Sequence, residues 1–274
     1  MTQERLKDGG IGRRITPPAS EEAVFTHFYY ARNDSDSPVT RHFIPSFEIF
    51  MVFSFGTPVT LAIPDREPMT GDRCLLIGPV RRAFAYTMHP GSEILSANFK
   101  HDAYYRFFGE INPGGNPVNP DESFEGTPFR NLSDSLSGLP GVDEKVAGIL
   151  AFARPYLAPR AASGERIVAL SELEAHLNPI KVISGEEQIS ERAVQLRHKK
   201  YLGYTAKEIT RYKRFLQTLK FLEGKKLPVD WAETVALNGY YDQSQMIRDF
   251  KFYLNLTPTG YLASRESLCS SNVD

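Results

Sequence analysis

The stretch 231–262 constrains the fold most, because it contains the start and stop signals of two short helices joined by a tight turn. An apolar segment ends at Asn238-Gly239, and glycine can adopt the positive φ that such a turn requires. Asp242 follows at the position of a helix N-cap, with Gln245 three residues later, which is the spacing of a capping box. The pattern therefore predicts one helix that ends near residue 238 and a second that begins at residue 243.

The second of these helices is amphipathic. Met246 and Phe250 lie four residues apart and define its buried face. Asn255, followed by Pro258, ends the helix. The opposite face carries Gln243, Ser244, Gln245, Arg248, Asp249 and Lys251. Two short helices joined by a glycine turn, the second with an exposed polar face, describe a helix-turn-helix.

The sequence GYYDQSQMIRDFKFYLNLTPTGYL resembles the second helix-turn-helix of the AraC/XylS family of bacterial transcription regulators. Gln245 and Met246 stand where relatives commonly carry histidine and phenylalanine, and Asn255 replaces the usual glycine. Methionine keeps its position apolar, and asparagine is the next-best residue for a left-handed C′ position. The Gln245 difference falls on the face that the resemblance assigns to DNA, so it bears on the sequence that is read and not on the fold.

A less typical unit precedes this one. Ser190 is a natural N-cap and Gly203 a natural stop for one helix, and the helix that follows, 205–222, would extend about 27 Å. The segment ISERAVQLRHKKYLGYTAKEITRYKRFLQTLKFL resembles the first recognition helix and the linker helix of the same family. It departs from the family at Leu196, at His198 and in the preceding VISGEEQ.

The resemblance places base-reading positions on both recognition helices. Arginine pairs bidentately with guanine, glutamine with adenine, and apolar side chains with the thymine methyl, and each good pair contributes ~1–3 kcal/mol of discrimination. Successive major grooves lie roughly 34 Å apart, so two units tied by a linker helix could enter adjacent grooves. The positions are Arg192, Gln195 and Leu196 on the first helix and Gln243, Ser244, Gln245, Ile247 and Arg248 on the second.

Four cations near these positions are expected to contact DNA phosphates, which position a protein and carry the salt dependence of binding. They are Lys199, Lys200, Arg211 and Lys251. An ordinary solvated helix face is the alternative for each. The expected core residues of the two units are Val194, His198, Trp231, Met246, Phe250 and Tyr261.

The first part of the chain reads as short strands separated by turns about every ten residues, which predicts an antiparallel barrel or sandwich. The expected strands are 24–25, 28–30, 47–55, 59–63, 74–77, 83–88 and 93–99. Helical spacing returns at 102–108, 142–157, 167–177 and 180–187, and 109–128 is expected to be a long loop. The order PSFEIFMVFSFG, CLLIGP, SEILSANFKHDAYYRFFG resembles the N-terminal β-domain of one AraC-like subgroup.

The predicted fold class is therefore α+β in two domains, a mainly antiparallel β-domain with flanking helices and an all-α domain with two helix-turn-helix motifs joined by a long helix. The 274 residues allow two cores. The expected division is an arm at 1–20, a β-rich sensor or dimerisation domain at 21–158, a linker at 159–164, a DNA-binding domain at 165–263 and a tail at 264–274. Residues 178–262 carry 14 Lys and Arg against 9 Asp and Glu, which suits a nucleic-acid module, although chance fluctuation explains it equally well.

The resemblance implies a sequence-specific regulator of transcription, an activator or a repressor, that binds double-stranded DNA. It leaves open contact with RNA polymerase, a homodimer and a small-molecule effector of unknown identity. The aromatic residues of the β-domain would suit a barrel lined for an apolar ligand or an ordinary core. No stretch is apolar enough to span a membrane and no signal peptide is evident, so a cytoplasmic location is expected.

Two alternatives come from other classes of protein. A cupin-like enzyme with an appended DNA-binding module would need clustered metal ligands, whereas His27, His42, His89 and His101 are scattered. No metal site, cofactor or catalytic residue is therefore expected, and Cys74 is expected in a strand core. A protein-interaction scaffold with a degenerate helix-turn-helix pair is the other alternative, and the atypical first unit favours it.

Overall fold

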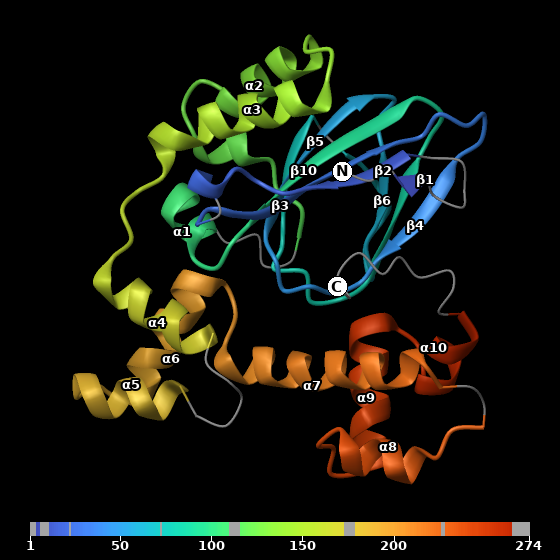
Figure 1. Ribbon diagram of the computed structural model, residues 1–274, viewed down its shortest axis with the longest axis vertical. Helices are drawn as coiled ribbons and strands as arrows, with labels where there is room; N and C mark the ends of the chain where they lie inside the picture. The colour runs from blue at the N-terminus through green and yellow to red at the C-terminus, as the bar shows by residue number, and fades with distance from the viewer. Residues whose placement is uncertain are drawn as a thin grey trace.

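The computed structural model describes residues 4–5, 11–21, 23–71, 73–109, 116–172, 179–225 and 228–264. The fold is α+β: two antiparallel sheets with covering helices form the N-terminal part, and helices alone form the C-terminal part (Figure 1). The predicted fold class is confirmed.

The β-domain consists of two antiparallel sheets that face each other. The six-stranded sheet has the order β1-β2-β3-β10-β5-β8, and the four-stranded sheet the order β4-β9-β6-β7. The strands are β1 (Glu4–Arg5), β2 (Ile11–Ile15), β3 (Phe25–Arg32), β4 (Val39–Phe43), β5 (Phe50–Gly56), β6 (Thr60–Ala62), β7 (Met69–Thr70), β8 (Cys74–Ile77), β9 (Phe84–Met88) and β10 (Ser92–Phe99).

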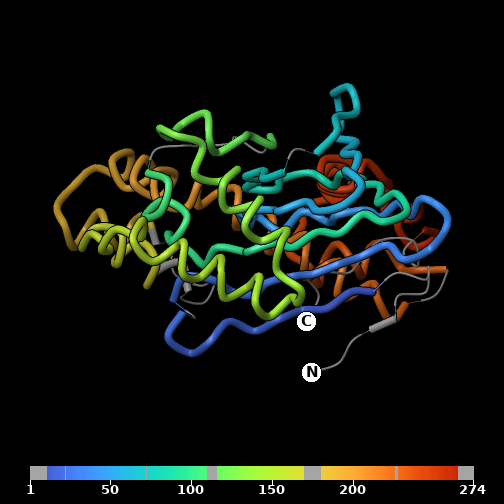
Figure 2. The backbone as a smooth tube through the Cα atoms, turned by 90° about the horizontal axis from the view of Figure 1, so that it is seen from above, coloured from blue at the N-terminus to red at the C-terminus, as the bar shows by residue number. Residues whose placement is uncertain are grey.

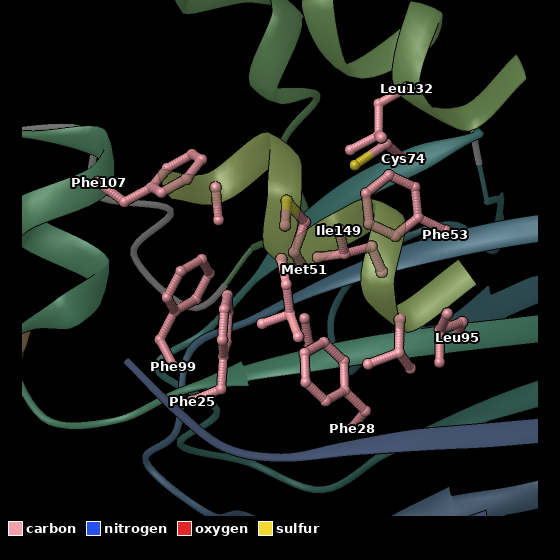
Figure 3. Close-up of a cluster of buried hydrophobic side chains, with 14 of the residues drawn as sticks. Phe25, Phe28, Met51, Phe53, Cys74, Leu95, Phe99, Phe107, Leu132 and Ile149 are labelled. Carbon is pink, nitrogen blue, oxygen red and sulfur yellow. The ribbon is translucent and has the colours of Figure 1, made fainter. Parts of the chain in front are cut away.

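Three helices cover the outer face of the six-stranded sheet: α1 (Ala103–Phe108), α2 (Pro128–Ser137) and α3 (Val142–Ala153). Because side chains alternate along a strand, one set of residues packs against these helices. Phe28, Met51 and Phe53 belong to that set, and they lie in one buried cluster with Ile149 of α3 (Figure 3). Cys74 lies buried in the same cluster, as expected.

The alternate side chains lie between the two sheets. Phe50, Leu75 and Ile94 from the larger sheet meet Tyr86 and Leu61 from the smaller one in a second buried cluster. Most of the aromatic residues for which a ligand-lined barrel and an ordinary core were both left open do not lie in this cluster. Phe25, Phe28, Tyr30, Phe53 and Phe55 belong to the helix-covered face instead. The ordinary-core interpretation therefore describes these five residues.

Several details of the predicted β-domain are wrong: β4, β7 and α2 were not predicted, and two segments have another conformation than expected. Ile11–Ile15, placed in a loose arm, forms strand β2, which pairs antiparallel with β3 through Gly12↔Ala31 and its neighbours. Phe47, expected in a strand, has a left-handed φ of 54° and precedes β5. That conformation takes its ring out of the alternation of the strand and toward the C-terminal helices. The apolar character of Phe47 is consistent with its burial, but it did not indicate that Phe47 packs against the C-terminal helices.

The C-terminal helices are α4 (Ala162–Glu172), α5 (Pro179–Glu187), α6 (Glu191–Leu202), α7 (Ala206–Glu223), α8 (Trp231–Leu237), α9 (Gln243–Leu254) and α10 (Pro258–Ser264). Helix α4 begins inside the predicted linker 159–164. Helix α7 runs beneath the β-domain, with α5 and α6 at one end and α8 to α10 at the other (Figure 1). Figure 2 shows the same separation from above, the gold helices to the left and the red ones to the right.

The two parts of the chain share a buried cluster. Phe47 contacts the rings of Tyr212 and Tyr253, with centroids 4.7 and 6.5 Å away, and Tyr204 at 5.4 Å. The Tyr212 hydroxyl donates a hydrogen bond of 2.5 Å to the carbonyl oxygen of Pro45. These side chains come from α7, α9 and the turn before α7, so the β-domain is part of the core around which the C-terminal helices pack.

Glu48 lies half-buried beside this cluster, and burial raises the pKa of its carboxyl to about 7, with the charge of Arg14 opposing the rise. The pKa of Tyr204 is raised to about 12 by burial and by the charge of Glu48, and burial and Glu48 also raise the pKa of Tyr212. Below pH 4.5 the Glu48 carboxyl is protonated in the folded and the unfolded chain. As pH rises from 4.5 to about 7, the unfolded chain loses a proton that the folded chain keeps, so the free energy of unfolding falls.

We therefore predict that Glu48→Gln is more stable than the wild type by about 1–3 kcal/mol at pH 8 and equally stable near pH 4.5. Chemical denaturation of both proteins at the two pH values measures the difference. Glu67→Gln, a change of an exposed carboxylate on the hairpin between β6 and β7, is the control and should show no such pH dependence. A Glu48→Gln advantage that is the same at both pH values would contradict the assignment.

Candidate nucleic-acid interface

Helix α6 has the ends that the sequence predicts. The Ser190 hydroxyl accepts a hydrogen bond from the amide of Ala193 at 3.2 Å, and Gly203 closes the helix with φ 78°. Capping of this kind satisfies backbone groups that have no partner inside a helix. On the helix surface Arg192 and Gln195 are exposed, and Leu196 is 61% exposed.

The opposite face of α6 is buried, and His198 belongs to it. Its Nδ1 lies 2.7 Å from the carbonyl oxygen of Tyr204, to which a protonated Nδ1 donates. Burial lowers the pKa of His198, and this hydrogen bond opposes the shift. Val194 is fully buried beside it. The core interpretation of both residues is confirmed.

Helix α9 is capped by Asp242, whose carboxylate accepts a hydrogen bond of 2.6 Å from the amide of Gln245. The Gln245 side chain in turn accepts from the amide of Tyr241 at 2.9 Å. The two side chains therefore secure the helix N-terminus reciprocally, close to the predicted capping box. Asn255 ends the helix with a left-handed φ of 57°, as expected for a substitute for glycine.

The predicted base-reading residues of α9 are not equivalent. Gln243, Ser244 and Arg248 are exposed, whereas Ile247 is half-buried. Gln245 is half-buried as well, and the oxygen that would accept a hydrogen bond from a base already caps the helix. The bidentate adenine contact expected of Gln245 therefore requires the capping bond to break, and Gln243, Ser244 and Arg248 are the stronger candidates on this helix.

Arg211 occupies a different place from the one predicted for a phosphate contact. Its Nε lies 2.6 Å from a carboxylate oxygen of Asp249 on α9, and Arg214 reaches the other oxygen at 2.8 Å. Asp249 is 2% exposed, so the two arginines neutralise a buried charge and fasten α9 to α7. The guanidinium of Arg211 also lies over the ring of Phe252, 4.5 Å from its centroid.

The three remaining predicted phosphate contacts are exposed, but they differ in surroundings. Lys199 and Lys251 lie on exposed faces of α6 and α9. Lys200 faces the β-domain, with its ammonium 5.4 Å from the ring centroid of Tyr105 in α1. Lys200 is therefore the weaker candidate of the three.

Sequence reasoning missed two groups at this surface. Helix α7 carries three exposed lysines, Lys207, Lys213 and Lys220. The signal in the sequence was that they lie off the apolar face of the helix, which Phe215, Leu219 and Leu222 define. Tyr241 is 93% exposed in the turn before α9, whereas its neighbour Tyr240 is buried. A fully exposed aromatic side chain beside a capped helix N-terminus is a further candidate for contact with DNA.

Among the described residues, no group of three or more histidine, cysteine or acidic side chains could hold a metal ion. His27 instead lies between β-domain side chains, 3.0 Å from Asn98 Nδ2, and burial lowers its pKa to about 4. None of the described helices combines the length and apolar character needed to cross a membrane.

No protein-family model matches the sequence, and no curated protein matches it. Among solved structures, the P21 form of ToxT from Vibrio cholerae is similar over 86% of this chain and 98% of that chain, with 13% identity and a TM-score of 0.41. ToxT with a bound unsaturated fatty acid is similar over 90% and 98%, with 12% identity and a TM-score of 0.41. The plu4264 protein from Photorhabdus luminescens covers 37% of this chain and 83% of its own, with 12% identity and a TM-score of 0.28. At TM-scores this low, the likenesses carry no argument about function.

Because Asp249 neutralises both arginines from a buried position, Asp249→Asn should lower the free energy of unfolding by about 2–4 kcal/mol. Glu233→Gln is the matched control, since Glu233 is exposed and lies 3.8 Å from Lys225. That change should stay within about 0.5 kcal/mol of the wild type. Equal effects of the two substitutions in chemical denaturation would show that the Asp249 ion pairs do not fasten α9.

Proposed function

We propose that the chain is a sequence-specific DNA-binding regulator of transcription of the AraC/XylS type. The observation that carries the proposal is the arrangement of two helix-turn-helix units, α5–α6 and α8–α9, at opposite ends of the 18-residue helix α7. Each second helix presents an exposed polar face, and both are capped as the resemblance requires.

The geometry suits a site with two separate elements. Helix α7 is about 27 Å long, and successive major grooves on one face of B-DNA lie roughly 34 Å apart. One chain can therefore place α6 and α9 in neighbouring grooves and read a sequence that need not be palindromic. Arg192 and Gln195 would read the first element, and Gln243, Ser244 and Arg248 the second. The lysines of α7 would contact the phosphates between them.

The β-domain would control this activity by population shift. An effector or a second copy of the chain that favours one arrangement of the two parts would change how α6 and α9 meet DNA. RNA polymerase is the expected further partner of an activator. The proposal gives the chain no catalytic role and places it in the cytoplasm, where it would meet DNA.

Exposed apolar side chains on both units favour a second candidate, a protein-interaction scaffold. Leu196 is 61% exposed, Leu237 is 58% exposed and Tyr241 is 93% exposed. Salt separates the two candidates. Binding through several phosphates weakens by orders of magnitude between about 50 and 200 mM salt, whereas an apolar protein interface does not.

Two neighbouring side chains of α9 should act differently on DNA. Arg248→Ala should relax preference at one base position by ~1–3 kcal/mol, because a bidentate base contact is lost. Lys251→Ala should weaken binding to all sequences alike and reduce the salt slope by about one. Affinities for the preferred site and its single-base variants measure both effects. If both changes act uniformly across sequences, the assignment of reading and positioning roles is wrong.

The experiment that tests the function is selection of preferred DNA from a random pool by the full-length protein. Two enriched elements about one helical turn apart would support the proposed function and base reading by both α6 and α9. A single enriched element would assign α6 to backbone contacts. No enrichment, with and without cell extract as a source of effector, would favour the scaffold.

A further inference from the structure

One loop of the β-domain touches the ends of both recognition helices. The loop 79–83 connects β8 of the larger sheet to β9 of the smaller one. Arg81 donates a hydrogen bond of 2.7 Å from Nη2 to the carbonyl oxygen of Gly203, the residue that closes α6. Two residues later, the amide of Ala83 donates a bond of 2.7 Å to the carbonyl oxygen of Tyr253 in the last turn of α9.

These bonds reach carbonyl groups that a helix leaves without internal partners. The last four carbonyl oxygens of a helix need outside donors, and positive charge is favoured near them. Arg81 supplies both at α6, and its Nε also lies 3.0 Å from a carboxylate oxygen of Glu208 in the first turn of α7. Desolvation alone would raise the pKa of Glu208, but hydrogen bonds from Thr205 and the charge of Arg81 lower it.

Packing reinforces the contact at α6. Gly203 is buried, and a Cβ added there would meet atoms of Ile49 and Pro79 at 3.4 Å. These are ordinary van der Waals distances, so glycine is favoured at this position by its φ of 78°. The end of α6 is therefore seated directly on the loop.

The loop is also continuous with the interior of the β-domain. Val80 is 3% exposed and belongs to the cluster between the two sheets, next in sequence to Arg81. Its carbonyl oxygen accepts hydrogen bonds from the amides of Ser46 and Phe47 at 3.2 and 3.1 Å. A change in how the two sheets pack would thus reach Arg81 one residue, and Ala83 three residues, along the chain from Val80.

The contacts leave the reading surfaces open. They lie at the C-terminal ends of α6 and α9, whereas the candidate base-reading residues lie in the first two turns of each helix. The loop therefore holds the helices away from their DNA-facing ends and does not cover those ends.

We propose that the loop 79–83 sets the separation of the two recognition helices, with Arg81 as the positioning residue, so that the β-domain fixes the spacing between the two DNA elements that one chain reads. This inference rests on the proposed function. It assigns to Arg81 a role in spacing preference and none in base reading.

The chain offers a matched control. Arg82, adjacent to Arg81, pairs with Asp65 inside the β-domain at 2.5 Å. Arg82→Ala removes the same charge from the same loop without touching α6 or α7. The full-length wild type, Arg81→Ala and Arg82→Ala would be compared on the selected bipartite DNA and on versions with the central spacing one base pair longer or shorter.

The wild type and Arg82→Ala should lose at least ~10-fold in affinity when the spacing changes by one base pair, since bases at one element are then misplaced. Arg81→Ala should lose less than ~3-fold, because the end of α6 is then released from the loop, whereas α9 stays bound to it through Ala83. Arg81→Met, which keeps an aliphatic stem but has no donor for Gly203 or Glu208, is measured by the same criterion if Arg81→Ala does not fold. Hydrogen exchange should be faster in the last turn of α6 in Arg81→Ala than in Arg82→Ala, whereas the last turn of α9, bound through the backbone amide of Ala83, should exchange alike in both.

An unchanged spacing dependence in Arg81→Ala, or in Arg81→Met in its place, would overturn the inference while leaving the proposed function intact. Failure of the wild type to enrich any DNA would overturn the proposed function and the inference with it. Equal hydrogen exchange in the last turn of α6 in the two alanine variants would show that Arg81 does not hold that helix end.

Discussion

The shared cluster around Phe47 is the constraint on which the arrangement of the whole chain depends. A phenylalanine of the β-domain with a left-handed backbone places its ring against tyrosines from α7, α9 and the turn between α6 and α7. Aromatic burial of this kind contributes more than any exposed ion pair, and it requires all partners at once. The C-terminal helices therefore pack against the β-domain as part of their own core, and do not hang from it by a linker alone.

The segment that connects the two parts of the chain is also attached to both of them. Arg160 lies in the segment predicted to be a linker, and its guanidinium makes three contacts of 2.7–3.0 Å with the carboxylate of Asp102, which is 1% exposed. Ser163 follows with a hydrogen bond of 2.6 Å to the hydroxyl of Tyr201 in α6. The connection between the two parts is thus tied at both ends, and motion of α6 relative to the β-domain requires these contacts to change.

The sequence predicted the helix-turn-helix units well because their signals are local. Ser190, Asp242 and Gly203 act within three or four residues of their own position, so spacing alone locates them. The contacts of Arg211 and Gln245 were not predictable in this way. Arg211 pairs with Asp249, 38 residues away in sequence, and the Gln245 side chain accepts a hydrogen bond from the backbone of its own turn. The prediction that Asp249 lies on the exposed face of α9 is wrong: Asp249 is 2% exposed, and it lies three residues after Met246 and four before Tyr253, on the buried face. Its charge favoured the exposed face in the sequence, and its two arginine partners explain why a carboxylate is tolerated there.

The β-domain was predicted in outline and not in detail for a related reason. Alternation identifies strands and their buried faces, but it does not say which of two faces meets helices and which meets another sheet. Phe50 and Phe53 are both phenylalanines of one strand, yet Phe53 lies in the cluster under the helices and Phe50 in the cluster between the sheets. Strand β2 was missed because its buried residue Ile15 is followed by prolines and preceded by glycines, which read as a loop until the neighbouring strand is known.

The distribution of charge follows from the same packing. Two of the five cations between 207 and 220 neutralise Asp249 and hold α9, so the remaining lysines of α7 supply the positive surface of the linker helix. Residues 228–264 contain four acidic side chains and only two basic ones, Arg248 and Lys251. Affinity for a polyanion would then come mainly from α7 and α6, and α9 would contribute selectivity through hydrogen bonds. Under the proposed function, α9 has too little charge to contribute much affinity of its own, so the contacts that hold its C-terminal end determine how it meets DNA.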